Sequence, residues 1–166
     1  MIKTRKDLKQ FIQADSKTRS GSNMLIKWVT RSDDYLPSLL VKCLRKYEYY
    51  LNRKRNIYNL FPYIWYWWNF RRLRVKTGIM LFPNTIGEGL NLVHPGFRRI
   101  AVFSHIGKNC TILPNVLIGR KNPGEKADVF IGDNCYISTG VTIMGPVTIG
   151  NNVTIAAGAA KIGRAS

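Results

Sequence analysis

Two histidines are the side chains in this sequence best suited to accept a proton at neutral pH, since imidazole has an ordinary pKa near 6.5. His94 stands in the run Val93-His-Pro-Gly96, where a regular six-residue spacing in the second half of the chain is interrupted. His105 directly precedes Ile106, at a position that the same spacing turns outward. We therefore interpret His94 as the candidate general base and His105 as a surface residue. The alternative for His94 is an exposed corner histidine without a chemical role.

The three cysteines form neither a metal-binding nor a disulfide pattern. Cys43, Cys110 and Cys135 are odd in number and widely separated, which disfavours a disulfide framework, and their spacing matches no metal motif. Cys110 and Cys135 fall at inward positions of the six-residue spacing, so we predict buried structural thiols there. The sequence therefore predicts no metal site and no cysteine nucleophile.

A large aliphatic residue recurs every six residues through the second half of the chain. A helix of 3.6 residues per turn cannot keep such a repeat on one face, whereas a triangular coil of three short strands and three turns can. The large residue points inward, and a smaller residue four positions later fills the interior near a corner. Coils must stack as parallel strands, because one coil cannot bury its own interior, and we expect roughly four coils. The large positions are Ile86, Leu92, Ile100, Ile106, Ile112, Ile118, Ile131, Ile137, Ile143, Ile149 and Ile155; the asparagines predicted at corners, where positive φ is tolerated, are Asn109, Asn134, Asn151 and Asn152.

Two insertions interrupt the repeat. Eight residues separate Leu92 from Ile100, and thirteen separate Ile118 from Ile131. The first insertion directly follows His94. The second, residues 120–129, is polar, so we expect it to leave the prism as a loop, where functional groups are often found.

The first half of the chain has helical rather than six-residue periodicity. We predict a helix over residues 4–17, with Thr4 as the N-cap, and a second over 37–55, with one apolar side. A third helix is predicted over 61–76, with Pro62 at its start and Gly78 just past its end. Residues 18–35 are interpreted as a linker or loop. The aromatic residues of the third helix are predicted to pack on a partner surface. We expect two domains: a basic, aromatic α-helical region over 1–77 and a β-helix over 78–166.

The basic charge of the chain belongs mainly to its first half. The formal net charge is +17; residues 1–77 hold 18 Lys and Arg against 5 Asp and Glu, a net +13, and residues 78–166 hold 8 against 4, a net +4. Such a segment suits phosphate-rich partners, and an anionic membrane surface is one candidate partner for the basic half. The alternative is a solvated basic face without a partner. Nucleic acid is the least favoured partner, because no nucleic-acid-binding motif is present.

The sequence has no obvious signal for export or membrane insertion. Its first residues carry charge without an apolar core. The longest apolar stretch, residues 57–70, is too short to span a bilayer and is interrupted by Asn59 and Pro62. We therefore expect a cytoplasmic location.

These patterns resemble a known family. The second half is similar to the bacterial hexapeptide-repeat acyltransferases, and the whole chain resembles their serine acetyltransferase branch. The runs Leu44-Arg-Lys-Tyr-Glu-Tyr-Tyr50 and Gly89-Leu-Asn-Leu-Val-His-Pro-Gly96, with the aromatic-basic helix between them, resemble members associated with surface-glycan biosynthesis. The resemblance implies a left-handed parallel β-helix, a homotrimer, and acetyl-CoA bound as acyl donor in a groove between adjacent subunits.

The resemblance also implies roles for particular residues. His94 corresponds to the catalytic base that deprotonates an acceptor hydroxyl. Five residues correspond to the acetyl-CoA groove, where small side chains let the pantetheine arm approach the backbone and Lys161 reaches a CoA phosphate: Thr139, Gly140, Gly145, Ala157 and Lys161. Small residues would also suit tight prism corners if no CoA bound.

The acceptor stays open between L-serine and a sugar hydroxyl of a surface-glycan precursor. The serine-specific members carry acidic groups near the base, and this chain has Met80 and Val93 at those positions. Those members also carry a second histidine in the protruding loop, where this chain has Ala127 and Asp128. Arg98, Arg99, Lys121 or Asp128 are candidates to contact another acceptor, and Glu88 is a candidate to orient His94. The alternative function is a catalytically silent β-helix that serves as a scaffold or assembly protein.

Overall fold

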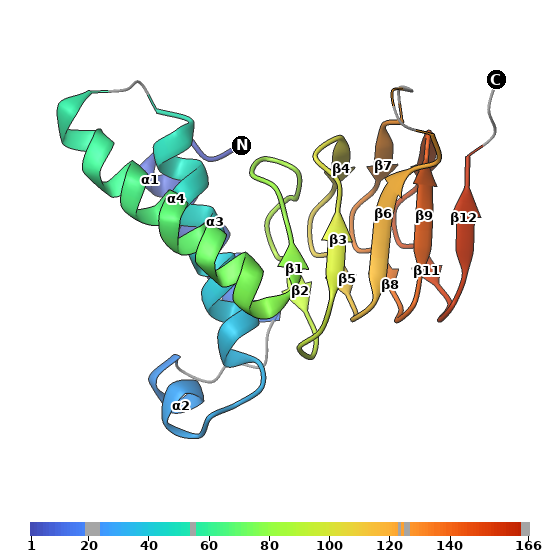
Figure 1. The fold of residues 1–166 in the computed structure, drawn as a ribbon, viewed down its shortest axis with the longest axis horizontal. Coiled ribbons are helices and arrows are strands. Elements are labelled where there is room, and N and C mark those ends of the chain that lie inside the picture. Colours follow the sequence, from blue (N-terminus) through green and yellow to red (C-terminus); the bar gives the residue numbers. More distant parts are fainter. Residues whose placement is uncertain (19–23, 54–55, 123, 125–126, 164–166) are drawn as a thin grey trace.

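Four helices precede a run of short strands in the computed structural model of this chain (Figure 1). The structure describes residues 1–18, 24–53, 56–122, 124 and 127–163. The helices are α1 (Arg5–Thr18), α2 (Met24–Val29), α3 (Tyr35–Leu51) and α4 (Ile57–Thr77). The last helix ends at Thr77 and the first strand begins at Ile79, with Gly78 between them in the left-handed conformation (φ 68°) that glycine tolerates.

The predicted helices are present, with different ends. Thr4 caps α1 as expected: its hydroxyl accepts from the Asp7 N–H at 3.1 Å, while the Asp7 carboxylate accepts from the Thr4 N–H. These backbone bonds, with one from Lys3, hold the pKa of Asp7 below its ordinary value. Helix α4 begins five residues before Pro62 rather than at it, because the Asn56 side chain caps an earlier turn by accepting from the Asn59 N–H.

The interpretation of residues 18–35 as a linker without secondary structure was wrong. Helix α2 lies within that range. Its six residues form less than two turns, too short for the periodicity of an amphipathic helix to stand out in the sequence.

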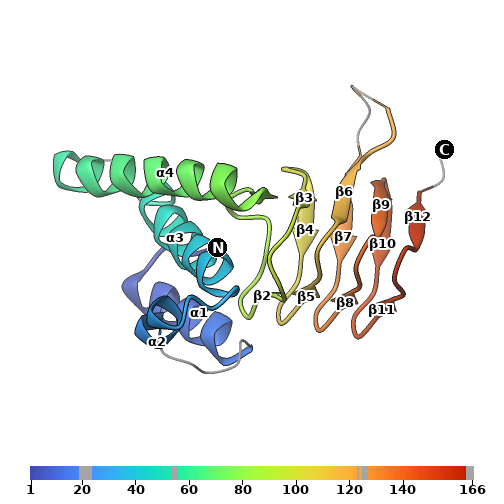
Figure 2. The same ribbon diagram turned by 60° about the horizontal axis from the view of Figure 1, so that its bottom comes forward.

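The strands wind into a triangular prism with three parallel sheets (Figures 1 and 2). Sheet A has five strands, β1 (Ile79–Met80), β3 (Arg98–Ile100), β6 (Val116–Arg120), β9 (Thr142–Gly145) and β12 (Ala160–Ile162). Sheet B has β4 (Ser104–Ile106), β7 (Val129–Ile131) and β10 (Val147–Ile149). Sheet C has β2 (Asn91–Leu92), β5 (Thr111–Ile112), β8 (Tyr136–Ile137) and β11 (Thr154–Ile155). Successive strands in the chain belong to different sheets, and the coil advances with a left-handed winding, so the predicted left-handed β-helix is confirmed.

Register between coils stacks the large residues of the repeat directly over one another. Ile100 pairs with Ile118, Ile118 with Ile143, and Ile112 with Ile137. Ten of the eleven predicted large positions are buried, and Ile155, in the last coil, is half-buried. The six-residue spacing therefore identified the inward-facing row correctly.

Asparagines line one edge of the prism, between sheets B and C. Asn109, Asn134 and Asn152 have φ between 53° and 57°, and their side-chain amides bond in sequence from coil to coil. Asn151 does not share this conformation; its side chain instead accepts from the Asp133 N–H at 2.8 Å. Three of the four predicted corner asparagines thus occupy positive-φ turns.

The predicted thiols of the second half are buried in the core. Cys110 is fully buried and Cys135 is 1% exposed, and each Sγ lies near the backbone carbonyl of the following coil. Burial raises the pKa of Cys110 to about 11. Because the thiolate is the reactive form, this thiol is inert at neutral pH.

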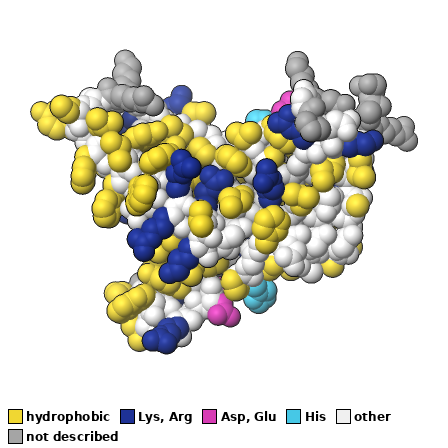
Figure 3. Space-filling view, viewed as in Figure 1, with side chains coloured by type: hydrophobic (Ala, Val, Ile, Leu, Met, Phe, Trp, Pro, Cys, Tyr) yellow, Lys and Arg dark blue, Asp and Glu magenta, His cyan; other side chains and the backbone are white. Residues whose placement is uncertain are grey.

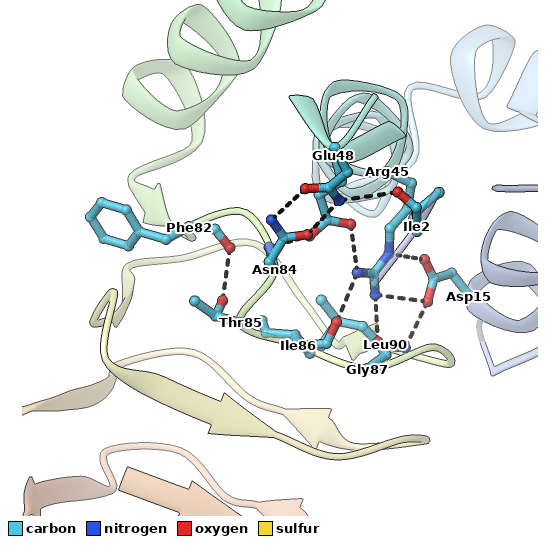
Figure 4. A network of polar contacts seen from close by, with 11 residues as sticks. Ile2, Asp15, Arg45, Glu48, Phe82, Asn84, Thr85, Ile86, Gly87 and Leu90 are labelled. Atoms are coloured by element: carbon cyan, nitrogen blue, oxygen red, sulfur yellow. Dashed lines mark hydrogen bonds and ion pairs between the residues drawn. The ribbon is translucent and has the colours of Figure 1, made fainter. Parts of the chain in front are cut away.

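Helices α1 and α3 cover the N-terminal end of the prism, where the first coil has no preceding coil to pair with (Figure 4). The guanidinium of Arg45 donates to the carbonyl oxygens of Ile86 and Gly87 at 2.9 and 2.6 Å. It also pairs with the carboxylates of Asp15 in α1 (2.8 Å) and Glu48 in α3 (3.1 Å). Arg45 is fully buried, so these four acceptors satisfy a charge that water does not reach.

The two carboxylates bond in turn to backbone amides of the same coil. Asp15 accepts from the Leu90 N–H at 2.8 Å, and Glu48 accepts from the Asn84 N–H at 2.7 Å. Burial raises the pKa of Glu48, although the neighbouring Arg45 opposes this shift. The helices therefore supply the donors and acceptors that a preceding coil would otherwise provide.

Removal of Arg45 should destabilise the fold strongly. The substitution Arg45→Met keeps most of the buried volume but leaves two buried carboxylates and two carbonyls without their donor, so we expect the free energy of unfolding to fall by about 3–5 kcal/mol. Urea denaturation followed by circular dichroism measures the change. Lys108→Gln, which breaks the exposed ion pair with Glu88, should cost less than about 1 kcal/mol; equal losses for the two variants would contradict the role given to Arg45.

Candidate active site

His94 lies on the edge of the prism where sheet C turns into sheet A. The chain crosses this edge once in each coil, at residues 93–97, 113–115, 138–140 and 156–158, and we call these four segments the His94 edge. Backbone bonds link neighbouring crossings: the Asn115 N–H donates to the Phe97 carbonyl, the Gly140 N–H to Pro114, and the Gly158 N–H to Thr139. His94, Thr139, Gly140 and Ala157 therefore lie on one edge, with the 113–115 crossing between His94 and Thr139.

The first insertion of the repeat widens this edge at His94. The backbone of His94 has φ 59°, a left-handed conformation that is uncommon outside glycine, asparagine and aspartate. Gly96 crosses close to the next coil, where an added Cβ would lie 3.0 Å from the Pro114 side chain. The extra residues therefore form a tight outward turn that leaves the His94 side chain exposed.

Arg98 holds this turn from inside the prism. Its guanidinium is fully buried and donates to the carbonyl oxygens of Val93, His94 (2.8 Å), Gly96 (3.1 Å) and Ile112 (3.1 Å). Three of these carbonyls belong to the turn itself. Arg98 therefore fixes the backbone that carries His94, and its burial excludes the suggested contact with an acceptor.

A signal for this role was present in the sequence. The residue two positions before each large inward residue also faces the interior, as Val116 does before Ile118. Arg98 stands two positions before Ile100 and pairs with Val116 in the sheet. A cation at a core position of the repeat, next to an insertion, indicates buried carbonyls that need a donor.

The suggested orienting acid for His94 is engaged elsewhere. Glu88 lies on the edge between sheets B and C, where its carboxylate accepts from Gln10 at 2.7 Å and pairs with Lys108 at 3.3 Å. Met80 contacts Arg74, with its sulfur 3.5 Å from a guanidinium nitrogen. Within the described residues, the imidazole ring of His94 makes no hydrogen bond to another side chain. The ring is therefore free to meet a ligand or a group from another copy of the chain.

The other histidine lies on the outer face of sheet B. His105 is exposed and stacks on Phe130 of the next coil, with ring centroids 4.8 Å apart. Its position agrees with the predicted outward direction.

Three of the five predicted acetyl-CoA residues form an exposed, shallow surface beside His94. Thr139, Gly140 and Ala157 are all exposed, as are Ala156 and Gly158. The Thr139 hydroxyl donates to the Pro114 carbonyl at 2.9 Å, across the neighbouring crossing. A Cβ added to Gly158 would meet no atom within 4 Å. This surface leaves room for a ligand to lie against the backbone.

The other two predicted acetyl-CoA residues lie elsewhere. Gly145 is buried on the edge between sheets A and B, where an added Cβ would lie 2.2 Å from the Ala127 carbonyl oxygen, so close packing of the returning 120–129 segment requires glycine. Lys161 pairs with Ile143 in sheet A, which puts it in the inward-facing row of the last described coil. Within one chain, neither residue lies on the His94 edge.

The second insertion also belongs to the edge between sheets A and B. Strand β6 ends at Arg120, whose guanidinium lies 4.8 Å over the Phe103 ring, and β7 begins at Val129. After β6 the described residues leave the prism, as expected (Figure 2), and the buried Ala127 lies next to the start of β7. Asp128 and Lys121 are exposed there. These groups and His94 occupy different edges of one chain.

Comparison with known proteins agrees with this architecture. Residues 128–160 match the family described as bacterial transferase hexapeptide (six repeats). Two curated relatives are both named bifunctional protein GlmU. The protein of Ruthia magnifica subsp. Calyptogena magnifica is 30% identical over 99 residues, which cover 54% of this chain and 21% of that protein. The protein of Geotalea uraniireducens (strain Rf4) is 39% identical over 87 residues, which cover 52% of this chain and 16% of that protein. The chain thus spans a small part of the curated relatives it matches.

Two solved structures share the fold over nearly the whole chain. Soybean serine acetyltransferase in its apo form superposes with a TM-score of 0.67 and 21% identity, covering 93% of this chain and 63% of that one. Serine acetyltransferase isoform 3 of Entamoeba histolytica, in complex with cysteine, superposes with a TM-score of 0.59 and 24% identity, covering 95% and 55%. The chain therefore carries the hexapeptide repeats of the bacterial transferases, as its sequence indicated. More particularly, its fold, helical region included, is that of the serine acetyltransferases.

Loss of Arg98 should displace His94 as well as weaken the fold. Arg98→Met leaves four buried carbonyls without a charged donor, so we expect a loss of about 3 kcal/mol in the free energy of unfolding. Because the sequence has only two histidines, proton NMR can follow each ring; the His94 signals should shift and those of His105 should not. Arg99→Met, at the exposed neighbouring position, should leave both histidines unchanged. An unmoved His94 in the Arg98 variant would contradict the positioning role.

Proposed function

We propose that the protein is an acetyl-CoA-dependent O-acetyltransferase with His94 as its general base. The observation that carries this proposal is the His94 edge: one exposed imidazole stands in line with the exposed, small corners at Thr139, Gly140 and Ala157. A thioester arm lying along those corners would bring its acetyl group toward His94. The similarity in fold to serine acetyltransferases supports the same assignment.

In the proposed reaction, neutral His94 takes the proton of the acceptor hydroxyl as its oxygen attacks the thioester carbonyl. A backbone N–H of the small corners stabilises the resulting oxyanion. Collapse of the tetrahedral intermediate breaks the carbon–sulfur bond, and the imidazolium returns its proton to the departing CoA thiolate. The proposed transfer is direct, because the thiols of Cys43, Cys110 and Cys135 are all buried and cannot form an acyl-enzyme.

We further propose that the complete site forms between copies in a homotrimer. Lys121 and Asp128 are exposed on a different edge from His94, so one chain alone cannot bring these three residues to the same ligand. A neighbouring prism packed beside the His94 edge would supply that second wall. The same arrangement would let Lys161 of a neighbouring copy approach the donor.

The proposed acceptor is a small molecule with a hydroxyl group, either L-serine or a sugar of a surface-glycan precursor. Val93 and Met80 offer no charge for an amino acid's ammonium group. This chemistry favours the sugar. The aromatic-basic helix that resembles the surface-glycan members supports the same choice.

Substitution of His94 tests the mechanism. His94→Ala should lower kcat for acetyl transfer by roughly 10²–10⁴-fold, because the hydroxyl loses its base. Acetyl-CoA turnover is measured with serine and with a panel of sugars, and light scattering should give three times the chain mass for both proteins. His105→Ala, which removes only an exposed ring stacked on Phe130, should retain near-normal turnover.

Full turnover by the His94 variant with the best acceptor would overturn the proposed mechanism. The second candidate function is a catalytically silent scaffold, and it gains support if the parent protein turns over no acceptor. One observation favours that candidate: no described side chain orients the His94 ring.

A bulky residue on the His94 edge should block the donor. Ala157 is exposed, so Ala157→Trp adds volume to the proposed groove without overfilling the core. Acetyl-CoA should raise the melting temperature of the parent protein, since it binds the folded state, and this shift should vanish in the variant. Thr154→Trp, at an exposed position on the face of sheet C, is the matched control. An undiminished shift in the Ala157 variant would mean that the donor binds elsewhere.

A further inference from the structure

Helices α2 and α4 expose an unusual number of large apolar side chains. The described part of the chain has no helix long and apolar enough to cross a membrane, yet most of the exposed large hydrophobic residues lie on these two helices. Figure 3 shows them on one face of the molecule, over α4 and over α2 below it, with Lys and Arg between. We call this surface the aromatic-basic face; its apolar members are Leu25, Ile26, Trp28, Val29, Ile57, Tyr58, Phe61, Ile64, Trp65 and Trp68.

The apolar members of α4 form a stripe. Positions 57, 58, 61, 64, 65 and 68 recur every three or four residues, which is the spacing of one helix face. The opposite side of α4 packs on α3, where Phe70 is buried and Tyr66 stacks on Tyr50. Trp65 and Trp68 are 57% and 61% exposed. The outer side of α4 is therefore left uncovered by this chain while the inner side packs within it, so the prediction of a partner surface now concerns the outer side alone.

Cations continue the same face, and acids are nearly absent from it. After Trp68, the exposed positions of α4 are Arg71, Arg72, Val75 and Lys76, and α4 has no Asp or Glu. A groove of about 480 Å³ lies along α3 and α4, with Met24 of α2 at its side. Four cations line this groove with apolar side chains and without any acid: Lys42, Lys46, Arg72 and Lys76.

We propose that this face docks the protein on an anionic phospholipid bilayer. Trp and Tyr favour the boundary between headgroups and acyl chains, and adjacent Lys and Arg are attracted to anionic lipid. The aromatic stripe would lie in that boundary, and the cationic groove would receive a lipid phosphate. A second copy of the chain fits less well, because a symmetric contact through α4 would oppose Arg71, Arg72 and Lys76 to the same cations.

The docking face borders the His94 edge. A second groove, of about 740 Å³, is lined by Trp28 and Val29 of α2, by Lys76 of α4, and by Pro95 next to His94. It also contains Arg31 and Asp33. A chain docked through α2 and α4 would therefore hold its His94 edge close to the bilayer surface. The docking does not depend on the proposed acetyl transfer and is tested without it.

Vesicle binding tests the proposal directly. Three of the four tryptophans, Trp28, Trp65 and Trp68, lie on this face, and Trp67 packs against the core from the inner side of α4. Their fluorescence therefore reports mainly on this face. The full chain should sediment with vesicles of mixed phosphatidylglycerol and phosphatidylcholine, with a blue shift of emission and quenching by brominated acyl chains. Binding to pure phosphatidylcholine should be weaker by roughly tenfold or more.

Matched variants separate the two parts of the face. Trp65→Ala with Trp68→Ala should reduce partition by roughly tenfold. Arg72→Gln with Lys76→Gln should reduce it by about fivefold per charge removed. Lys108→Gln with Lys121→Gln removes the same charge from exposed positions of the β-helix and should leave partition nearly unchanged.

The following results would overturn the proposal. The protein does not bind mixed vesicles, or it binds neutral and anionic vesicles equally. The control variant and the groove variant lose partition into vesicles to the same extent. Duplex DNA displaces the protein from vesicles at physiological salt. A solution mass without vesicles that falls when Trp65 and Trp68 are replaced would also contradict it, because a second copy of the chain would then cover the face. Acetyl transfer to a soluble acceptor can succeed or fail independently of each of these outcomes.

Discussion

Backbone hydrogen bonding between stacked coils is the constraint on which this structure depends. Each coil of the prism uses its neighbours' amides and carbonyls, so any place without a matching neighbour must find donors elsewhere. Two such places are filled by the two largest fully buried side chains, Arg45 at the first coil and Arg98 at the first insertion. Each guanidinium has five N–H donors in a planar fork, and each meets several carbonyls at once. Lysine, with a single nitrogen, could not reach the same acceptors.

The same constraint explains why the helical region and the prism pack as they do. Asp15, Arg45 and Glu48 bond to four backbone groups of the first coil, and the apolar sides of α3 and α4 close the open end of the core. With α3 held on the prism, α4 packs on α3 by its inner side and leaves its aromatic stripe outward. The capping of the prism and the exposure of the aromatic-basic face are therefore two consequences of one packing arrangement.

The candidate site arises from an irregularity in an otherwise regular coil. The extra residues after Leu92 project His94 from the prism, while Arg98 keeps the projecting turn in one conformation. Beyond the next corner, at residues 113–115, the corners that carry Thr139, Gly140 and Ala157 keep to the repeat, so they continue the His94 edge in a straight line. Variation in the inserted turn can alter the chemistry while the core of isoleucines stays the same.

The sequence by itself determined the coil, its inward row and the edge on which His94 lies. A period of six admits one large inward position per strand, and Ile100, Ile118 and Ile143 could be aligned by counting. The left hand of the coil could not come from spacing, because the period is the same for either hand and general crossover preference favours the right; it came from the family resemblance. The start of α4 and the existence of α2 were missed because an asparagine cap and a six-residue helix give weak local signals.

Only the tertiary structure decided which charged and small residues share a location. Arg98 and Glu88 were both candidates for contact near His94, yet Arg98 lies inside the prism and Glu88 faces α1 on another edge. Gly145 resembled the small residues of the donor surface, but its glycine is required by the Ala127 carbonyl. The physical reason is that these assignments depend on contacts between segments distant in the chain. A six-residue repeat specifies whether a side chain points in or out, but not what it meets there.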